Sequence, residues 1–389
     1  MTDAIIIELC NYLDYPPGGQ LTFARQLVQV YGNRLALVGL TTDDTPVGQW
    51  VEKKVGSTLC RFLSVMRVNP GAGKPLVPAR LKGYCAIKSC KRQILSLGVR
   101  SLLVGAPEAL LAVRKWNWES VCFVFAGVEN PVYHSRYLGA RLFSRVYEKI
   151  LFSAVGRADR VLACADDKSI RECESRSGGR IKPGTLVKFP TRVDTQVFKP
   201  MHKAEARAGL ESVGPGPIIV NCGRINRYKG WNLILDAFRL FVRQCPQAEM
   251  IFVGDGEDRP LLEAYARSHS LDGQVRITGF LPVADVVRYL NAADLCVVGS
   301  VKEGWSLAMM EALACGKPIV STDVSGARDM IETGCNGFVL TTRDAEDFAR
   351  AMHQALGLEG AQEVSLKIAA KYSVDHLARE LGALWRPLA

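Results

Sequence analysis

The stretch 217–256 decides the fold. It begins with the apolar run PIIVNCG (217–223), continues with WNLILDAFRLFVRQC (231–245), and ends with EMIFVGDG (249–256). The first and last runs have the length of buried strands and stop at glycines, whereas the middle run has apolar residues at helical spacing. The order strand, helix, strand predicts a βαβ unit with two parallel strands.

The same alternation continues in both directions from this stretch, with the later apolar runs VRITGF (275–280), DLCVVGS (294–300), PIVSTD (318–323) and GFVL (337–340). In the first half we predict strands at 4–9, 34–40, 59–65, 101–104, 121–125 and 160–164. Helices are predicted at 20–31, 80–96, 107–115, 136–155 and 166–177. A segment rich in proline and glycine, 190–217, separates the halves.

We therefore predict an α/β fold of two doubly wound, Rossmann-like domains that face each other across a cleft. The expected domains are 1–198 and 199–365, followed by a C-terminal helical segment, 366–389, that packs back on the first domain. Ligands of such parallel sheets bind beyond the carboxyl ends of the strands, so residues directly after strands are the candidates for function.

The composition is that of a globular protein, with 48% hydrophobic and 23% charged residues in 389. The apolar run Ile5–Leu9 is too short for a signal-peptide core and has no basic flank, and no run of 18 apolar residues occurs. The 12 cysteines form no CxxC pair, and several lie inside apolar runs, which favours a reducing cytosol and argues against a zinc site.

The positive charge is concentrated in the first half. Residues 1–200 contain 29 Lys and Arg against 16 Asp and Glu, whereas residues 201–389 contain 20 against 23. The asymmetry indicates different partners for the two halves: an anionic membrane surface, a phosphate-bearing substrate or nucleic acid. Two basic stretches, 80–92 and 136–149, carry much of this charge. The second interleaves arginines with apolar residues, as amphipathic membrane-surface helices do, although a helix that packs its apolar face on a sheet gives the same pattern.

The first chemical motif is CGRINRYKG (222–230), in which a strand ends at Gly223 and the cations Arg224 and Lys229 follow. Glycine lets the backbone approach a ligand closely, and Arg and Lys suit phosphate oxygens. The motif therefore favours a diphosphate site. A solvated basic turn is the alternative that this segment leaves open.

The second motif is EGWSLAMME (303–311), which leads from a strand through a loop into a helix that starts near Ser306. The opening N–H groups of a helix are unsatisfied and attract phosphate. Glu303 precedes the helix and Glu311 lies within it. Two acids beside an anion site are costly unless they bind hydroxyl groups, such as those of a sugar and a ribose. Two surface glutamates on a solvated helix are the alternative.

Taken together, the motifs resemble those of glycosyltransferase family 4. The segment 303–311 resembles the family's E-x7-E motif, and 223–230 resembles its GR-xxxx-KG segment. Further similarities follow in the family's order: VDTQVF (193–198), FVGDG (252–256), VRITGFL (275–281), KPIV (317–320) and NGFV (336–339).

The resemblance implies a GT-B fold with the sugar donor held mainly by the second domain. It assigns the diphosphate to Arg224 and Lys229 and the transferred sugar to Glu303, which are the expected catalytic residues. The expected donor-binding residues are Gly18, Gly19, Gly223, Gly254, Phe280, Leu281, Gly304, Trp305, Ser306, Leu307 and Glu311. Within this set, Glu311 binds the ribose and the backbone at Phe280 and Leu281 meets the base.

One position departs from the family. Members often place a histidine after a strand of the first domain, facing the reacting sugar, but here the strand 121–125 runs into AGVENP (126–131). Glu129 or Asn130 could take this position, or His134 could fold back from beyond the turn. The acceptor-side role therefore stays open among these three residues.

The resemblance implies a retaining hexosyltransferase. No metal-ligand spacing and no DxD beside a strand end occur, so we expect the reaction to be independent of metal and to need no cofactor. The resemblance implies a front-face displacement through an oxocarbenium-like state. The predicted partners are a nucleotide-sugar donor and a glycan or polyprenyl-diphosphate-linked acceptor in surface polysaccharide assembly. We predict a cytoplasmic protein, peripheral at the inner face of the membrane.

Two other classes of protein are alternatives to a glycosyltransferase. Other GT-B enzymes, such as a nucleotide-sugar epimerase or a phosphorylase, lack the Glu303–Glu311 pattern in this setting. A nucleic-acid-binding protein would fit the charge, but no segment resembles a recognition motif, so no nucleic-acid partner is predicted.

Overall fold

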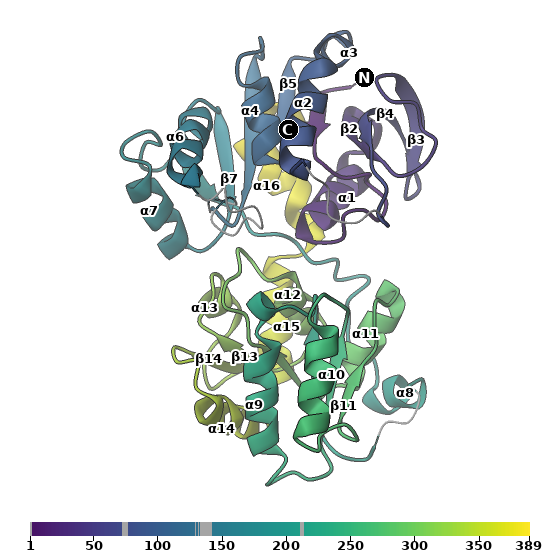
Figure 1. The fold of residues 1–389 in the computed structure, drawn as a ribbon, viewed down its shortest axis with the longest axis vertical. Coiled ribbons are helices and arrows are strands. Elements are labelled where there is room, and N and C mark those ends of the chain that lie inside the picture. The colour runs from purple at the N-terminus through teal and green to yellow at the C-terminus, as the bar shows by residue number, and fades with distance from the viewer. Residues whose placement is uncertain (1, 72–76, 129, 131, 133–141, 211–213) are drawn as a thin grey trace. The chain divides into compact units, whose positions relative to one another are not determined.

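The computed structural model describes residues 2–71, 77–128, 130, 132, 142–210 and 214–389. The chain divides into two compact units (Figure 1). Unit 1 contains Met1–Thr191 together with Asp375–Ala389, and unit 2 contains Arg192–Val374. Among the described helices, none is long and apolar enough to cross a membrane.

Unit 1 is built on an eight-stranded sheet with the order β3-β4-β2-β1-β5-β6-β7-β8. Of the strand pairs that the structure describes in this sheet, only β3–β4 is antiparallel. Its strands are β1 (Ala4–Ile7), β2 (Leu35–Thr41), β3 (Trp50–Val55), β4 (Thr58–Arg67), β5 (Ser101–Val104), β6 (Ser120–Ala126), β7 (Arg160–Cys164) and β8 (Leu186–Lys188). Its α-helices are α1 (Gly19–Tyr31), α2 (Ala79–Ser89), α3 (Lys91–Leu95), α4 (Pro107–Val113), α6 (Ser144–Val155), α7 (Asp167–Arg176) and α16 (Leu377–Leu384).

Helices cover both faces of this sheet. The central strands are apolar along their length, and alternate residues of them pack in one core with residues of α2, α4 and α6. The C-terminal helix α16 contacts α1. The Tyr31 hydroxyl donates to the Ala378 carbonyl at 3.2 Å, and the buried Trp385 donates its ring N–H to Ser120 Oγ at 2.8 Å. The end of the chain is therefore part of unit 1.

The structure adds two strands that were not predicted in unit 1. Strand β3 reads WVEKKV and alternates partly buried and exposed residues at the edge of the sheet, so its charged residues hide the strand pattern. Strand β8 has only three residues. The predicted helix 80–96 is two helices, α2 and α3, which meet at Cys90.

Unit 2 is built on a six-stranded, fully parallel sheet with the order β11-β10-β9-β12-β13-β14. The strands are β9 (Ile218–Cys222), β10 (Glu249–Val253), β11 (Val275–Ile277), β12 (Leu295–Val298), β13 (Ile319–Thr322) and β14 (Gly337–Leu340). The α-helices are α8 (Lys203–Ala208), α9 (Trp231–Phe241), α10 (Arg259–Ser268), α11 (Val283–Ala292), α12 (Leu307–Ala314), α13 (Ala327–Met330), α14 (Ala345–Leu356) and α15 (Ala361–Lys371).

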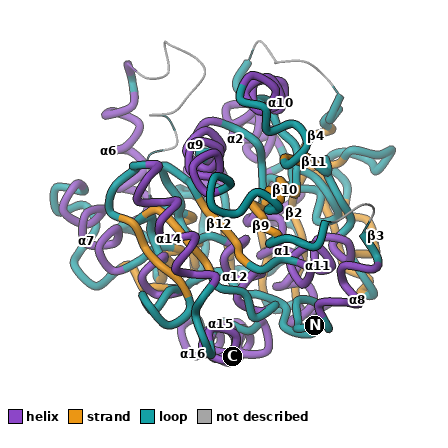
Figure 2. The backbone as a smooth tube through the Cα atoms, turned by 90° about the horizontal axis from the view of Figure 1, so that it is seen from below, coloured by secondary structure: helices purple, strands orange, loops and turns teal. Residues whose placement is uncertain are grey.

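The sheet of unit 2 is buried on both faces, which is why its strands are continuous apolar runs. Helices α9, α10 and α14 pack in the core on one face, and α11, α12 and α15 pack in the core on the other. In Figure 2 the strands β9, β10 and β12 run between these two layers.

The units are joined at 191/192 and at 374/375. Val193 donates its N–H to the Tyr372 carbonyl at 3.0 Å, and Val374 donates to the Val193 carbonyl at 2.9 Å. These bonds tie the VDT segment to unit 2, so the division lies ahead of the expected boundary at 198/199. Helix α15 contacts α12 within unit 2, and the segment that groups with unit 1 begins at Asp375.

All 12 cysteines are free. Cys85, in α2, and Cys335, before β14, are exposed, whereas the others are buried or half-buried. Burial raises the pKa of the Cys296 and Cys315 thiols to about 12. The buried thiols therefore behave as small apolar groups of the core.

Candidate functional site

The order of the strands in unit 2 reverses between β9 and β12. The chain moves outward from β9 to β10 and β11, and then outward in the other direction from β12 to β13 and β14. Such a switch point leaves a crevice at the carboxyl ends of the two central strands, where ligands bind. The motif 222–230 follows β9 and the motif 303–311 follows β12, so the topology brings them to one place.

Glycines let two turns at this edge touch through their backbones. Gly223 and Gly254 have φ of +135° and +145°. A Cβ on Gly254 would lie 2.1 Å from the Gly223 carbonyl oxygen. Gly254 also pairs with Gly279, which places Phe280 directly beside this edge. Phe280 is 73% exposed, and its contact with a nucleotide base, like that of Leu281, stays a prediction.

Lys229 and Glu303 meet directly. Lys229 ends a short 3-10 helix, Arg227–Lys229, in which the Asn226 side chain accepts the Lys229 N–H at 3.0 Å. The Lys229 ammonium lies 2.6 Å from Glu303 Oε1, and the Ser300 hydroxyl donates to the same oxygen at 2.7 Å. Only 11% of the Glu303 side chain is exposed, so the cation and the hydroxyl provide the partners that a buried carboxylate needs. Ser300 was not predicted.

Arg224 is the more exposed cation. Its Nε lies 2.9 Å from Glu257 Oε2, and both side chains reach solvent. Glu257 follows the VGDG turn and was also not predicted, because nothing in its own segment indicates a partner 33 residues away. The two predicted phosphate-binding cations thus each lie beside a carboxylate.

Helix α12 begins at the site. Ser306 is its N-cap residue, and the Ser306 hydroxyl accepts the Met309 N–H at 3.4 Å. The N–H groups of Leu307 and Ala308 open the helix and have no acceptor within it. Together with Gly304 in the preceding loop, these groups form the predicted anion-binding end.

Glu311 lies farther along α12 and is half-buried. Burial raises the pKa of its carboxyl to about 8. At neutral pH this acid is therefore mostly protonated, and hydroxyl groups that donate to it would stabilise its ionised form.

Trp305 is buried, with 7% of its surface exposed. Its ring packs edge-on against Tyr372 at 5.4 Å between centroids, and a Cβ on Gly326 would lie 2.6 Å from it. The ring thus fills the core of unit 2, and its predicted contact with a donor sugar stays a prediction.

The predicted residues of unit 1 are only partly described. Gly18, with φ of +143°, is the N-cap residue of α1, and a Cβ on Gly18 or Gly19 would meet nothing within 4 Å. Asn130 is buried: its Nδ2 donates to the Ser144 carbonyl at 2.9 Å, and its Oδ1 accepts the Val132 N–H at 3.0 Å. Its side chain therefore links the turn at Val132 to the first residue of α6. Glu129 and His134 lie outside the described residues.

Unit 1 has its own switch point, between β1 and β5, and sequence analysis missed the acid there. Glu8 directly follows β1, and a Cβ on Gly105 would lie 1.7 Å from Glu8 Oε2. Its Oε1 accepts the Leu9 N–H at 2.9 Å. Burial, with a smaller contribution from the charge of Glu108, raises the pKa of Glu8 to about 7. The signal in the sequence is a lone acid that ends the apolar run AIII.

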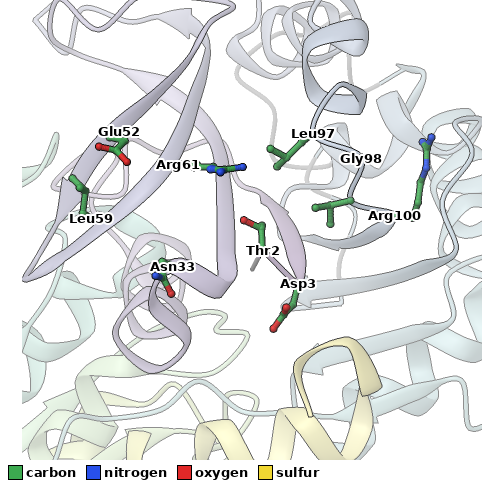
Figure 3. A pocket seen from close by; sticks show the side chains of 10 residues that line it. Thr2, Asp3, Asn33, Glu52, Leu59, Arg61, Leu97, Gly98 and Arg100 are labelled. Carbon is green, nitrogen blue, oxygen red and sulfur yellow. The ribbon is translucent and has the colours of Figure 1, made fainter.

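Two further features lie apart from this geometry. In the part of the chain that the structure describes, no group of three His, Cys, Asp or Glu side chains could hold a metal ion. A pocket of about 750 Å³ in unit 1, lined among others by Asp3, Arg61 and Arg100, contains none of the predicted residues (Figure 3). It lies at the amino ends of β1 and β5, opposite the edge where ligands of parallel sheets bind.

Solved structures share the whole fold. Sucrose-phosphate synthase from Thermosynechococcus elongatus aligns with a TM-score of 0.79 over 100% of this chain and 99% of its own, at 20% identity. HepE from Anabaena, solved in complex with UDP, aligns with a TM-score of 0.72 over 99% of this chain and 100% of its own, at 17% identity. The predicted α/β GT-B fold with two Rossmann-like domains is confirmed.

The comparison with known families agrees with the resemblance of the motifs. Residues 202–371, which make up most of unit 2, match the family Glycosyl transferases group 1. Relatives include the D-inositol 3-phosphate glycosyltransferase from Nocardiopsis dassonvillei, 28% identical over 56% of this chain and 52% of its own. Another is the lipopolysaccharide core biosynthesis glycosyltransferase LpsE from Rhizobium meliloti, 32% identical over 38% of this chain and 42% of its own. The chain spans about half the length of these relatives.

Proposed function

We propose that the protein is a retaining glycosyltransferase that moves a hexose-type sugar from a nucleotide-sugar donor to a glycan or lipid-linked glycan acceptor in surface polysaccharide assembly. The observation that carries the proposal is the meeting of Lys229, Glu303 and the opening amides of α12 at the switch point of unit 2. A cation, an acid that can accept sugar hydroxyls and free N–H groups are the parts that a sugar diphosphate requires.

In this proposal the leaving diphosphate is neutralised by Arg224 and Lys229 together with the amides at the start of α12, so no metal ion is needed. Glu303 orients the transferred sugar, and Glu311 accepts the ribose hydroxyls. The acceptor attacks from the face that the diphosphate leaves, and a phosphate oxygen of the donor takes the acceptor's proton. The chain's task is to position the groups and to stabilise the developing negative charge.

A thermal-shift panel of UDP, GDP, ADP and their sugars tests the donor class, and product analysis tests the reaction. Arg224→Ala should reduce turnover far more than donor affinity, because the leaving diphosphate gains charge in the transition state. Equal losses in turnover and affinity would count against this role. An epimerised or phosphorolysed product would support the other GT-B classes. Salt-dependent DNA binding without nucleotide binding would favour a nucleic-acid-binding protein.

We also propose that unit 1 contacts an anionic membrane surface that carries a polyprenyl-diphosphate-linked acceptor. The support lies on α6 and the turn before it, where the large apolar side chains of Leu142, Phe143, Val146 and Ile150 are exposed. Arg145 and Lys149 are exposed on the same segment. Apolar side chains that enter the lipid boundary, flanked by cations for the headgroups, are typical of interfacial helices.

Co-sedimentation with vesicles of phosphatidylcholine, with and without phosphatidylglycerol, tests this surface. The double substitution Val146→Asp and Ile150→Asp should abolish binding. The control is Lys168→Gln with Arg171→Gln, which removes charge from the exposed face of α7 and should reduce binding only slightly. Absence of wild-type binding at every salt concentration would refute the membrane contact.

A further inference from the structure

Arg343 follows β14 and is charged, yet among the described residues it has no carboxylate partner. Its Nη1 donates to the Ser300 carbonyl at 2.8 Å, and its Nη2 donates to the Gly299 carbonyl at 3.0 Å. The guanidinium thus spans two consecutive carbonyl oxygens of the turn that follows β12. A planar fork with fixed donors fits such a pair, whereas a lysine would reach one oxygen at a time.

The turn that Arg343 holds is joined to its neighbours on the other sides as well. Thr322, at the end of β13, donates its hydroxyl to the Ser300 carbonyl at 2.7 Å. Val301 donates its N–H to the Tyr228 carbonyl at 2.8 Å. A Cβ on Gly230 would lie 1.8 Å from the Gly299 carbonyl oxygen and 3.1 Å from Arg343 Nη2. Arg343 therefore lies where the turns after β9, β12 and β14 meet.

This turn orients the acid of the site. The Ser300 hydroxyl donates to Glu303 Oε1 at 2.7 Å, and the Lys229 ammonium lies 2.6 Å from the same oxygen. Both partners hold Oε1, and Glu303 Oε2 accepts no hydrogen bond from any residue that the structure describes. One oxygen is therefore fixed and the other is left for a ligand.

We propose that Arg343 is a positioning residue: by fixing the Gly299–Ser300 turn it sets the Ser300 hydroxyl and Lys229 on one oxygen of Glu303, so that the other oxygen faces the donor sugar. The assignment rests on the proposed glycosyltransferase function. It predicts that loss of Arg343 misplaces Glu303 without removing any group that touches the diphosphate. A misplacement on the scale of an ångström costs on the order of 100-fold in rate.

The test compares Arg343→Met, which keeps the length of the side chain, with Arg350→Met. Arg350 is exposed on α14 and pairs with Asp347, so its loss serves as the matched control. The first readout is hydrogen exchange of the segment 299–306, which should become faster in Arg343→Met alone. The second is release of UDP or GDP from the sugar nucleotide that the wild type hydrolyses. We expect turnover to fall by about 10- to 100-fold with nearly unchanged KM.

Two further variants separate positioning from general destabilisation. Arg343→Lys should restore only part of the turnover, and millimolar guanidinium should restore part of it in Arg343→Ala. If Arg343 acts through Ser300, the double variant Arg343→Met with Ser300→Ala should have the same turnover as the less active of the two single variants. If the two residues act independently, the two losses of turnover should multiply.

The outcomes are distinguishable. Unchanged exchange of 299–306 in Arg343→Met overturns the positioning role, whatever the reaction is. Faster exchange with turnover equal to that of Arg350→Met overturns the link to Glu303. A wild type that binds and hydrolyses no nucleotide sugar refutes the proposed function instead, and the Glu303 assignment with it.

Discussion

Glu311 carries a proton at neutral pH because burial raises its pKa to about 8. Ribose hydroxyls donate to a carboxylate, so nucleotide binding should favour the ionised form and release a proton. The affinity for UDP or GDP should therefore increase as the pH rises toward 8 and level off above it. Calorimetry in buffers of different ionisation enthalpy measures the released proton. In Glu311→Gln the proton release should disappear; if it persists, it comes from another group.

If Arg224 binds the donor diphosphate as proposed, Glu257 should compete with phosphate for it. The ion pair spans 2.9 Å and is exposed, so it is worth about 0–1 kcal/mol. Glu257→Gln should therefore raise the affinity for a nucleoside diphosphate by up to roughly fivefold. Glu263→Gln is the control, because Glu263 pairs with Arg259 instead. A lower affinity in Glu257→Gln would show that Glu257 supports the ligand rather than opposing it.

Glu8 should make the stability of unit 1 depend on pH. Its pKa in the folded chain is about 7, above the ordinary value of 4.5, so the folded state binds the proton more tightly. The protonated Glu8 carboxyl therefore contributes to the free energy of unfolding. This contribution, on the order of 3 kcal/mol, is fully present below pH 4.5 and is lost as the pH rises through 7. In Glu8→Gln, the free energy of unfolding measured in urea should depend less on pH. Glu52→Gln, at an exposed position, should leave the slope unchanged.

The positions of some candidate residues could be predicted from the sequence, and those of others could not. Arg224, Lys229, Glu303 and Glu311 lie in segments whose strand, turn and helix pattern is local, so their positions follow from the sequence. Arg343 differs because the carbonyls that it binds lie 43 and 44 residues earlier in the chain. Backbone carbonyls have no side-chain signature, so no pattern in the sequence indicates such a partner.

The turn after β10 depends on one glycine. Gly254 has φ of +145°, and a Cβ there would lie 2.1 Å from the Gly223 carbonyl oxygen. Gly254→Ala should reduce the stability of unit 2 by about 2 kcal/mol or more, because strain and overlap add. Gly273→Ala is the control: its Cβ would meet nothing within 4 Å, and the change should lie within about 0.5 kcal/mol. Equal unfolding midpoints of Gly254→Ala and Gly273→Ala in urea would contradict the close contact between Gly254 and the Gly223 carbonyl.

At the level of elements, all strands of unit 2 were predicted, including the two at its edges, whereas both edge strands of unit 1 were missed. Strands β9, β10 and β12 are continuous apolar runs because helices cover both faces of their sheet. Strand β3 carries Glu52, Lys53 and Lys54 at an edge, where charged residues prevent unwanted pairing and also hide the strand. The sequence does not indicate the break between α2 and α3 at Cys90 either, because no proline or glycine lies there.

On the scale of the whole molecule, the C-terminus stabilises the unit that contains the N-terminus. Ending the chain at Val374 would remove α16 and the buried Trp385 from unit 1. Thermal unfolding should then show a lower transition for unit 1, while the UDP- or GDP-induced shift of unit 2 is retained. Arg379→Ala, at an exposed position of α16, should change neither transition. Loss of the nucleotide shift in the truncated chain would show that the units depend on each other for folding.

The distribution of the cysteines gives the molecule a pair of native attachment points for spectroscopic probes. Cys85 belongs to unit 1 and Cys335 to unit 2, and both thiols are exposed, while the other ten are buried or half-buried. A maleimide dye or spin label should therefore react first at these two positions in the unmodified sequence. The separation between the two probes, followed by energy transfer or pulsed electron resonance as nucleotide is added, would report any change in the distance between the two units.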